Sequence, residues 1–410
     1  MMTDATTVLV VGGGATGTGI ARDLSLRGVD VTLAERDGLS GGTSGRSHGL
    51  LHSGARYAEA DRVGAEECLK ENEILRSIAG ECIRETGGLF VQLADDDADY
   101  FEEKRAACES IGIRTELLDA DEAKNRVPGL SDDVERAMWV PDGAIYPSRL
   151  CAANAADAEQ HGADIYPHAP LEDLTVEDGQ VTKARLGGSV DGTVEAEYVV
   201  NAAGAWAGKV AALAGLDVRM APSRGVMVSV EYDTLDPVLN RCRDPDDGDI
   251  VVPHEDEVVL GTTSVPVSDP DEYEQAQWEI EKSIEECAAM LPAVADAPVV
   301  REWWGVRPLY APDEGEGSRR GISRGFFTLD HADDGVANMA SIVGGKLTTY
   351  RQMAEETSDF VCDRFGVDAE CETASRQLPD AEDAQKLDEL IAAYDGQGPT
   401  DEDIVGAAAD

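Results

Sequence analysis

The chain has 410 residues, of which 42% are hydrophobic, so it is long enough for two packed domains and too long for one simple core. Its 82 Asp and Glu residues outnumber its 34 Lys and Arg residues, and the formal net charge of −48 argues against binding to nucleic acid or to an anionic membrane surface. Because the acidic residues are interleaved with apolar runs along the whole chain, they exclude a disordered acidic tail; they predict a salt-accumulating halophile as the source, an acidic surface and low stability at low ionic strength.

The N-terminal residues have the pattern of a dinucleotide-binding unit. A buried strand is predicted over residues 7–11, a glycine-rich turn over 12–17 and a helix over 15–26, which Gly28 ends. A second strand over residues 29–35 ends at Glu35, whose carboxylate can accept hydrogen bonds from ribose hydroxyls. This pattern predicts a pyrophosphate at the N-terminus of the helix, but it does not separate NAD from FAD.

The next segment, residues 41–57, carries more polar groups than a simple connector needs. Its glycines and hydroxyls suit a loop that wraps a pyrophosphate and a flavin. Its charged and aromatic polar side chains are Arg46, His48, His52, Arg56 and Tyr57.

The middle of the chain predicts helices and then strands. Helices are expected over residues 65–83, over 98–111 and, after a turn, within 143–158. Short strands follow over 165–200, and the buried strand 198–204 ends in a second phosphate-type turn. Residues 222–330 alternate strands with loops around an acidic helix near 272–290, which predicts an antiparallel substrate domain. The apolar stretch 198–216 contains Asn201 and Lys209, so it is not expected to span a membrane, and no signal peptide is visible.

The cysteines and most histidines predict no metal site. The eight cysteines show no ligand spacing, which favours reduced, mostly buried thiols in a cytoplasmic protein. Four histidines are expected to be ordinary loop or surface residues: His161, His168, His254 and His331.

Two arginine-containing segments are candidate anion sites. Arg307 lies in the apolar and aromatic run 303–309, where an unpaired cation would be costly, so a substrate phosphate or carboxylate is expected beside it. Arg324 lies in the second segment, 322–325. In so acidic a chain, the alternative for any single arginine is a surface ion pair.

A second glycine-rich run, Gly344–Arg351, answers the N-terminal one near the end of the chain. Two glycine loops with a single dinucleotide fingerprint predict one long cofactor held at both ends, as FAD is held in flavoproteins. Because no second fingerprint is present, the sequence argues against an NAD(P)H site and for a flavin, iron–sulfur or quinone electron acceptor.

Together these segments resemble the FAD-dependent glycerol-3-phosphate dehydrogenases, above all the large (A) subunit of the anaerobic type. The resemblance spans residues 7–366 and is most specific in the runs 48–57 and 344–351. It implies an α/β fold of the glycine and D-amino-acid oxidase type, in which an FAD-binding Rossmann-like domain carries an inserted antiparallel-sheet substrate domain. It also implies oxidation of sn-glycerol 3-phosphate to dihydroxyacetone phosphate, by hydride transfer from C2 to N5 of FAD.

The resemblance assigns the substrate side of the site. Arg307 and Arg324 would clamp the phosphate, and Arg56 and Tyr57 would line the substrate pocket. His52 would lie near the reacting carbon as general base or, alternatively, as a structural histidine. Lys346 or Arg56 would stabilise alkoxide character, or, alternatively, Lys346 would only orient the flavin.

The expected FAD contacts come from the glycine loops and from the segments between them. They are Gly12, Gly14, Ala15, Thr16, Gly17, Glu35, Arg36, Thr43, Ser44, Arg46, Ser47, His48, Leu171, Ala203, Gly204, Trp206, Gly345, Lys346, Leu347 and Thr348.

Two departures from the family pattern change the expectations. Met227 stands where the aerobic enzymes carry a histidine, which favours His52 as the base. The cysteine-bearing C-terminal domain of the anaerobic enzyme's large chain has no counterpart before Asp410, so residues 367–410 are expected to be an acidic segment that begins a truncated C-terminal region. The predicted domains are a discontinuous FAD-binding domain (1–90, 140–222 and 325–366) and a substrate-binding domain (91–139 and 223–324).

The resemblance further implies companion flavin and iron–sulfur subunits that pass electrons to membrane quinone. We therefore expect a cytoplasmic protein, peripheral at the inner face of the cell membrane through its partners. Two alternatives stay open: an FAD-dependent oxidase or dehydrogenase of an amino or 2-hydroxy acid, and a flavin subunit that mainly relays electrons.

Overall fold

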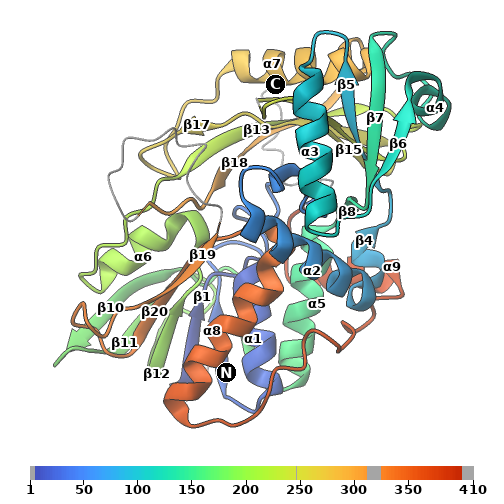
Figure 1. The fold of residues 1–410 in the computed structure, drawn as a ribbon. Coiled ribbons are helices and arrows are strands. Elements are labelled where there is room, and N and C mark those ends of the chain that lie inside the picture. Colours follow the sequence, from blue (N-terminus) through green and yellow to red (C-terminus); the bar gives the residue numbers. More distant parts are fainter. Residues whose placement is uncertain (1–4, 246, 312–324, 399–410) are drawn as a thin grey trace.

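The computed structural model describes residues 5–245, 247–311 and 325–398. Within these residues the strands form an eight-stranded sheet, a nine-stranded sheet and a small three-stranded sheet. The eight-stranded sheet lies in the lower part of Figure 1 and the nine-stranded sheet in the upper part. The site described below lies where the two meet.

The lower sheet has a parallel centre in the order β9-β2-β1-β12-β20. Its parallel strands are β1 (Ala5–Val11), β2 (Val31–Ala34), β9 (Asp164–Tyr166), β12 (Gly192–Asn201) and β20 (Met339–Gly344). Three antiparallel strands extend it: β10 (Leu171–Glu177), β11 (Gln180–Leu186) and β19 (Phe326–Asp330).

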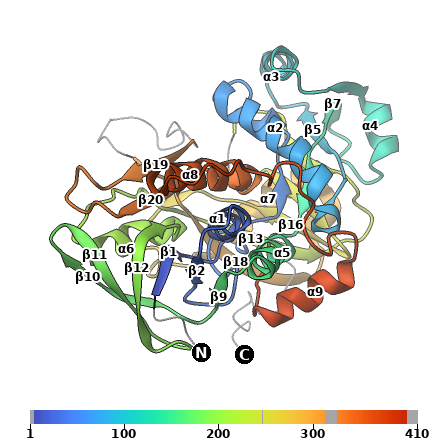
Figure 2. The ribbon, with the colours of Figure 1, turned by 90° about the horizontal axis from the view of Figure 1, so that it is seen from below.

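Both faces of this sheet are covered, which explains why its central strands are continuously apolar. Val8 and Val10 point to one face, where α1 (Ala15–Leu26), α5 (Pro147–Gln160) and α8 (Tyr350–Phe365) pack. Figure 2 shows α1 lying between α8 and α5. Leu9 and Val11 point to the other face, which α6 (Ala207–Leu213) and the β10–β11 hairpin cover.

The upper sheet is built from two separate parts of the chain. Its strands are β5 (Gly88–Leu93), β6 (Glu116–Asp119), β7 (Val134–Val140), β13 (Ser223–Glu231), β14 (Val238–Arg241), β15 (Ile250–His254), β16 (Glu257–Gly261), β17 (Val265–Pro266) and β18 (Val299–Arg307). Neighbouring strands are antiparallel, as predicted, except β14 and β5, the pair that joins the two parts. Leu89 and Val91 face α4 (Ala120–Arg126), α7 (Gln277–Met290) and η4 (Pro292–Ala295), whereas Phe90 faces α3 (Ala98–Ser110).

The third sheet is small, and one of its strands, β3, lies within the polar 48–57 segment. It consists of β3 (Leu50–Leu51), β8 (Gly143–Ile145) and β4 (Ile83–Arg84). After β3 the chain forms η1 (Ala55–Tyr57), α2 (Arg62–Ile78) and η2 (Gly80–Cys82). Two further short turns are η3 (Gly204–Trp206) and η6 (Leu347–Thr349).

Several predicted elements are confirmed, with shifts that capping explains. The helix over residues 15–26 is α1 itself. The predicted helix 65–83 is α2, which begins earlier because the Asp61 carboxylate caps it by accepting from the Gly64 N–H at 3.0 Å. The segment after residue 366 packs back on the lower domain through α9 (Ala384–Ala393), which contacts α5. The domain boundaries themselves stay a prediction.

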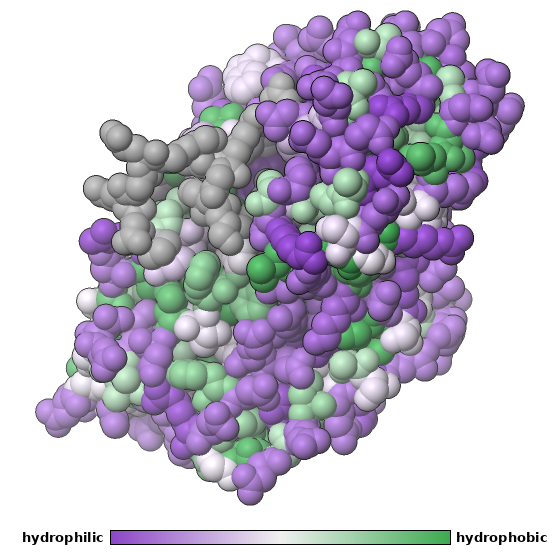
Figure 3. Space-filling model, in the orientation of Figure 1, coloured by the Kyte–Doolittle hydropathy of each residue, from purple (hydrophilic) through white to green (hydrophobic). Residues whose placement is uncertain are grey.

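Hydrophilic residues cover most of the face shown in Figure 3. In the described part of the chain, no helix is both long and apolar enough to cross a membrane.

Candidate cofactor and substrate site

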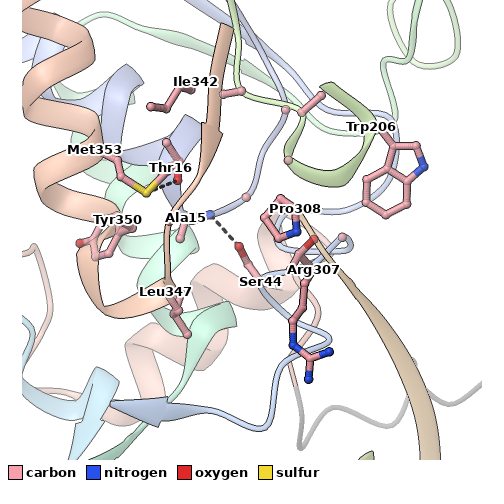
Figure 4. A pocket seen from close by; sticks show the side chains of 18 of the residues that line it. Ala15, Thr16, Ser44, Trp206, Arg307, Pro308, Ile342, Leu347, Tyr350 and Met353 are labelled. Carbon is pink, nitrogen blue, oxygen red and sulfur yellow. Dashed lines mark hydrogen bonds between the residues drawn. The ribbon is translucent and has the colours of Figure 1, made fainter. Parts of the chain in front are cut away.

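A cavity of about 480 Å³ opens at the carboxyl ends of β1, β2 and β12. Residues from both glycine loops line it, together with parts of the 42–57 segment, α6 and the end of β18. Figure 4 shows its opposite sides: Trp206, Arg307 and Pro308 face Ile342, Leu347, Tyr350 and Met353, with Ala15, Thr16 and Ser44 between them.

The N-terminal glycine loop, residues 12–17, forms a backbone cradle that packs too closely on its neighbours for larger residues. Gly12 has φ +112°, and a Cβ there would lie 2.6 Å from the Ala202 carbonyl oxygen. The Ala15 N–H, in the first turn of α1, donates to Ser44 Oγ at 3.0 Å (Figure 4). Gly17 does not line the cavity; a Cβ there would lie 1.9 Å from the Gly12 carbonyl oxygen, so this glycine lets α1 pack on β1.

Glu35 lies at the end of β2, as the sequence predicts for a ribose-binding carboxylate. Its two oxygens accept hydrogen bonds from the Gly13 N–H at 2.5 Å and the Asp37 N–H at 2.9 Å. Burial raises the pKa of its carboxyl, and those two donors oppose the rise. Arg36 stacks on the ring of Trp206, with the guanidinium carbon 4.3 Å from the ring centroid.

The sequence did not predict an apolar group that lines the cavity together with Leu171. It consists of Pro170, Val210 and Leu213. Val210 and Leu213 belong to α6, whose helical pattern was visible in the sequence but whose orientation depends on packing against β10, β12 and β20.

The segment 41–48 is held against β18, and this contact places Arg307. Thr43 Oγ1 donates to the Val306 carbonyl oxygen at 2.7 Å, and a Cβ on Gly305 would lie 2.5 Å from the Arg46 carbonyl oxygen. The backbones therefore touch, and Arg307 follows directly at the edge of the cavity. Its guanidinium donates to Thr262 Oγ1 at 3.2 Å.

Two predicted arginines are not found on the cavity lining. Arg46 does not line the cavity, and its Nε donates instead to the Gly41 carbonyl oxygen at 3.1 Å. Arg324, the second predicted phosphate ligand, lies outside the described residues.

The structure brings His52, Tyr57 and Lys346 together on the cavity lining. Tyr57 Oη lies 3.3 Å from His52 Nε2, and the centroids of the two rings are 5.1 Å apart. Lys346 Nζ lies 5.0 Å from the centroid of the Tyr57 ring. An imidazole, a phenol and a cation thus share one wall, an arrangement that suits proton removal beside a developing negative charge.

Arg56, by contrast, does not line the cavity. Its guanidinium donates to Asp249 Oδ1 at 2.7 Å and to Asn240 Oδ1 at 3.3 Å, and the Asp249 side chain is only 1% exposed. Burial opposes the charge on Arg56, but the Asp249 carboxylate outweighs it and raises the pKa of Arg56. Met227 also lies off the cavity, buried against Val259 and Trp303.

The second glycine-rich run, residues 344–351, forms a loop that returns to the cavity. Of the predicted contacts in this returning loop, Gly345, Lys346 and Leu347 line the cavity, whereas Thr348 does not. Thr348 is buried behind the lining, and its Oγ1 accepts a hydrogen bond from the His52 N–H at 3.1 Å.

The loop-or-surface prediction is wrong for His254, which ends the buried strand β15, whereas His331 lies in a loop as predicted but is not at the surface. His254 is fully buried, and its Nε2 lies 2.9 Å from the carbonyl oxygen of His48, which lines the cavity. Burial lowers the pKa of His254 to about 4, so a neutral ring donates this hydrogen bond. His331 is buried as well, with Nε2 2.9 Å from Ser341 Oγ. Among the residues that the structure describes, no group of three or more His, Cys, Asp or Glu side chains could hold a metal ion.

Comparison with known proteins matches residues 7–351 to the family of FAD-dependent oxidoreductases. The chain is 49% identical to the A1 subunit of the anaerobic glycerol-3-phosphate dehydrogenase of Haloferax volcanii, over 97% of this chain and 70% of that protein. It is 40% identical to the corresponding chain of the anaerobic enzyme of Escherichia coli K12, over 93% of this chain and 71% of that protein. The chain belongs to this family of FAD-dependent oxidoreductases.

Solved structures support the fold of this FAD-dependent oxidoreductase. The glycerol-3-phosphate dehydrogenase from Bacillus halodurans, complexed with FAD, superposes with a TM-score of 0.69 at 24% identity, over 95% of this chain and 71% of that chain. Glycine oxidase from Bacillus cereus superposes with a TM-score of 0.68 at 21% identity, over 91% of this chain and 98% of that chain. The predicted fold class is therefore confirmed.

The residues present fit FAD, the family's cofactor. Gly12, Gly344 and Gly345 line one cavity from its two glycine loops, and their positive φ angles (+112°, +83° and +77°) are ones that larger residues rarely adopt. Most of the predicted contact residues line it; Gly17, Arg46 and Thr348 stand behind the lining.

Proposed function

We propose that this oxidoreductase converts sn-glycerol 3-phosphate to dihydroxyacetone phosphate, with FAD as the electron acceptor. One observation carries the proposal: His52, Lys346 and Arg307 line the same cavity as the glycine cradle. The first two groups suit oxidation of an alcohol, and the third suits a phosphate. The names of the relatives support the same substrate.

When bound, FAD supplies the site that accepts a hydride. The chain's own residues then have to remove the hydroxyl proton, because a neutral alcohol is a poor hydride donor. His52 takes this proton in our proposal, because a neutral imidazole is a common general base for such a proton. Tyr57 holds the ring of His52, at 3.3 Å from Nε2. Lys346, over the Tyr57 ring, stabilises negative charge on the substrate oxygen and disfavours a second cation beside it.

Arg307 binds the phosphate and so fixes the position of the reacting carbon. Arg307 is the last residue of β18, and Thr43 of the 41–48 segment, which we call the cofactor loop, donates a hydrogen bond to the backbone of this strand. The position of β18 therefore sets the distance between the phosphate site and the cofactor. Such positioning can contribute several kcal/mol to catalysis. Arg324 remains the proposed second phosphate ligand.

Reduction of the bound flavin tests the substrate. The purified chain, reconstituted with FAD in concentrated KCl without oxygen, should lose its flavin absorbance with glycerol 3-phosphate and keep it with glycerol. If an amino acid or a 2-hydroxy acid reduces the flavin and glycerol 3-phosphate does not, the alternative substrate class is correct.

Substitution of Arg307 tests the phosphate assignment. Arg307→Gln should raise KM for glycerol 3-phosphate about 10- to 100-fold, equivalent to roughly 1.4–2.8 kcal/mol, with a smaller change in Arg307→Lys. The matched control is Arg219→Gln, which changes an arginine whose side chain is 61% exposed. An unchanged KM in Arg307→Gln would mean that the phosphate binds elsewhere.

We also propose that electrons leave this chain through companion flavin and iron–sulfur subunits to membrane quinone, at the cytoplasmic side of the membrane. The relatives are named as single subunits of a larger enzyme, which supports a complex with further chains. Membranes of the source cells should oxidise glycerol 3-phosphate in a quinone-dependent reaction. Deletion of the gene for this chain should abolish this activity, and reintroduction of the gene should restore it. Quinone reduction by the isolated chain alone would argue against the partners.

A further inference from the structure

Side chains from two distant elements hold the backbone of His52 on both sides. The His52 N–H donates to Thr348 Oγ1 at 3.1 Å, and the His52 carbonyl oxygen accepts from Asn72 Nδ2 at 3.2 Å. Thr348 and Asn72 are both buried, with 1% and 2% of their surface exposed. Two hydrogen bonds from buried side chains therefore define where this peptide segment lies.

The segment that carries His52 has little regular structure to hold it otherwise. The preceding strand β3 contains only Leu50 and Leu51, and Gly49 and Gly54 flank the segment with φ angles of +70° and +94°. Backbone of this kind gives no fixed direction to a side chain by itself. The hydrogen bonds from outside the segment supply that direction.

The elements that carry Asn72 and Thr348 are joined to each other through neighbouring residues. Asn72 also donates to the Pro141 carbonyl oxygen at 3.2 Å and accepts from Arg76 Nε at 2.8 Å. Glu71, its neighbour on α2, forms a buried ion pair with Arg351 at 2.7 Å, and Arg351 follows Thr348 by three residues. The helix α2 and the returning loop thus form one rigid support.

We propose that Thr348 and Asn72 are positioning residues, which aim His52 at the substrate through its backbone and take no part in the chemistry. This inference rests on the proposed function, in which His52 accepts the hydroxyl proton. It changes the role predicted for Thr348 from a cofactor contact to a support of the base. A displacement of about 1 Å in a reacting group can cost roughly 100-fold in rate, so the loss of either hydrogen bond slows the chemical step.

Three variants of Thr348 separate this role from a structural one. Thr348→Val removes the acceptor at nearly constant shape, and Thr348→Ser retains it. The rate of flavin reduction at saturating substrate should fall about 10- to 100-fold in Thr348→Val and recover in Thr348→Ser. The dissociation constants of FAD and of glycerol 3-phosphate should stay within about threefold of the wild type, because Thr348 does not line the cavity. If Thr348→Val does not fold, Thr348→Ala removes the same acceptor without the added methyl group.

A double-mutant cycle with His52→Asn gives the decisive result. If Thr348 acts through the imidazole, Thr348→Val slows flavin reduction in the wild type and has no further effect in the His52→Asn background. An equal loss in both backgrounds, or a loss explained by weaker FAD binding, overturns the proposal. Should another alcohol or amine reduce the wild-type flavin in place of glycerol 3-phosphate, the proposed substrate is wrong, and the same cycle with that compound still tests the placement of His52.

Discussion

The buried ion pair between Glu71 and Arg351 allows a quantitative test of how the two halves of the site are joined. Arg351 Nε and Nη2 donate to the two oxygens of Glu71 at 2.8 and 2.7 Å, and the side chains of Arg351 and Glu71 are 2% and 0% exposed. Burial opposes the charge on Arg351, but the carboxylates of Glu71 and Glu355 outweigh it and raise the pKa of Arg351. Glu71→Gln replaces the buried carboxylate of this pair by a neutral amide.

The expected loss follows from what Arg351 keeps. Breaking a buried ion pair by removal of one partner costs about 3–5 kcal/mol. Arg351 retains Glu355 at 2.7 Å and Thr373 at 3.2 Å, so we expect the lower end, about 3 kcal/mol. Unfolding entropy of about 2.1 cal/mol/K per residue gives roughly 0.9 kcal/mol/K for 410 residues, so Tm should fall by roughly 3–4 °C.

Thermal unfolding of the FAD-loaded protein at about 1 M and about 3 M KCl measures this loss. Because the pair is buried, the difference in Tm between the variant and the wild type should be the same at both concentrations. Glu66→Gln is the matched control: it lies on the same helix, in an ion pair with Arg62 whose side chains are 49% and 58% exposed, and should change the stability by about 0.5 kcal/mol or less. A loss in Glu71→Gln that matches this control, or one that disappears in high salt, would refute the reasoning.

Three further predictions address charge, cofactor release and pH. Lowering KCl to about 0.1 M lengthens the Debye length from about 3 to about 10 Å, so the Tm of this chain of net charge −48 should drop steeply; a constant Tm would contradict the surface-repulsion argument. Asp271 accepts hydrogen bonds from Trp206 Nε1 and Lys209 Nζ, both at 2.7 Å, and these two donors line the edge of the cavity. Asp271→Asn should therefore release FAD about 3- to 10-fold faster in a fluorescence assay. Glu274→Gln, at an exposed residue nearby in the sequence, should leave the rate of FAD release unchanged. Burial lowers the pKa of His254 to about 4 in the folded state, against about 6.5 in the unfolded state, so between these pH values the unfolded state binds a proton that the folded state lacks. The free energy of unfolding should therefore fall by up to about 3 kcal/mol as the pH decreases from 6.5 to 4. In urea unfolding at a series of pH values, His254→Gln should lose less stability over this range than the wild type.

The sequence predicted those parts of the fold and site that short segments determine. The first strand, the glycine turn, α1 and Glu35 lie within one stretch of the chain, and each constrains the next. The helix α1 therefore has the predicted bounds. The two glycine loops could be assigned to one cofactor for the same reason, since each loop carries its own turn chemistry.

The supports of the site could not be predicted, because they are pairs of polar groups far apart in the chain. Arg56 and Asp249 are separated by 193 residues, His48 and His254 by 206, and Glu71 and its arginine partner by 280. One signal was present in two cases. Glu71 lies on the same helical face as the buried Cys68 and Leu75, and His254 ends a fully buried strand, so each predicts a buried partner without naming it.

The distribution of charge limits how this protein can bind an anionic substrate. Its deeply buried basic side chains bind its own carboxylates, as Arg22 binds Asp157 at 2.7 Å, and its net charge of −48 repels a phosphate at long range. In molar salt this repulsion acts over only about 3 Å, but long-range attraction is screened equally. Recognition must therefore depend on groups in direct contact with the phosphate, where hydrogen bonds to a guanidinium act and salt screens little. The position of Arg307, the proposed phosphate ligand, is fixed by the backbone contact between β18 and the 41–48 segment, and under this proposal it should matter more for affinity than the total charge of the surface.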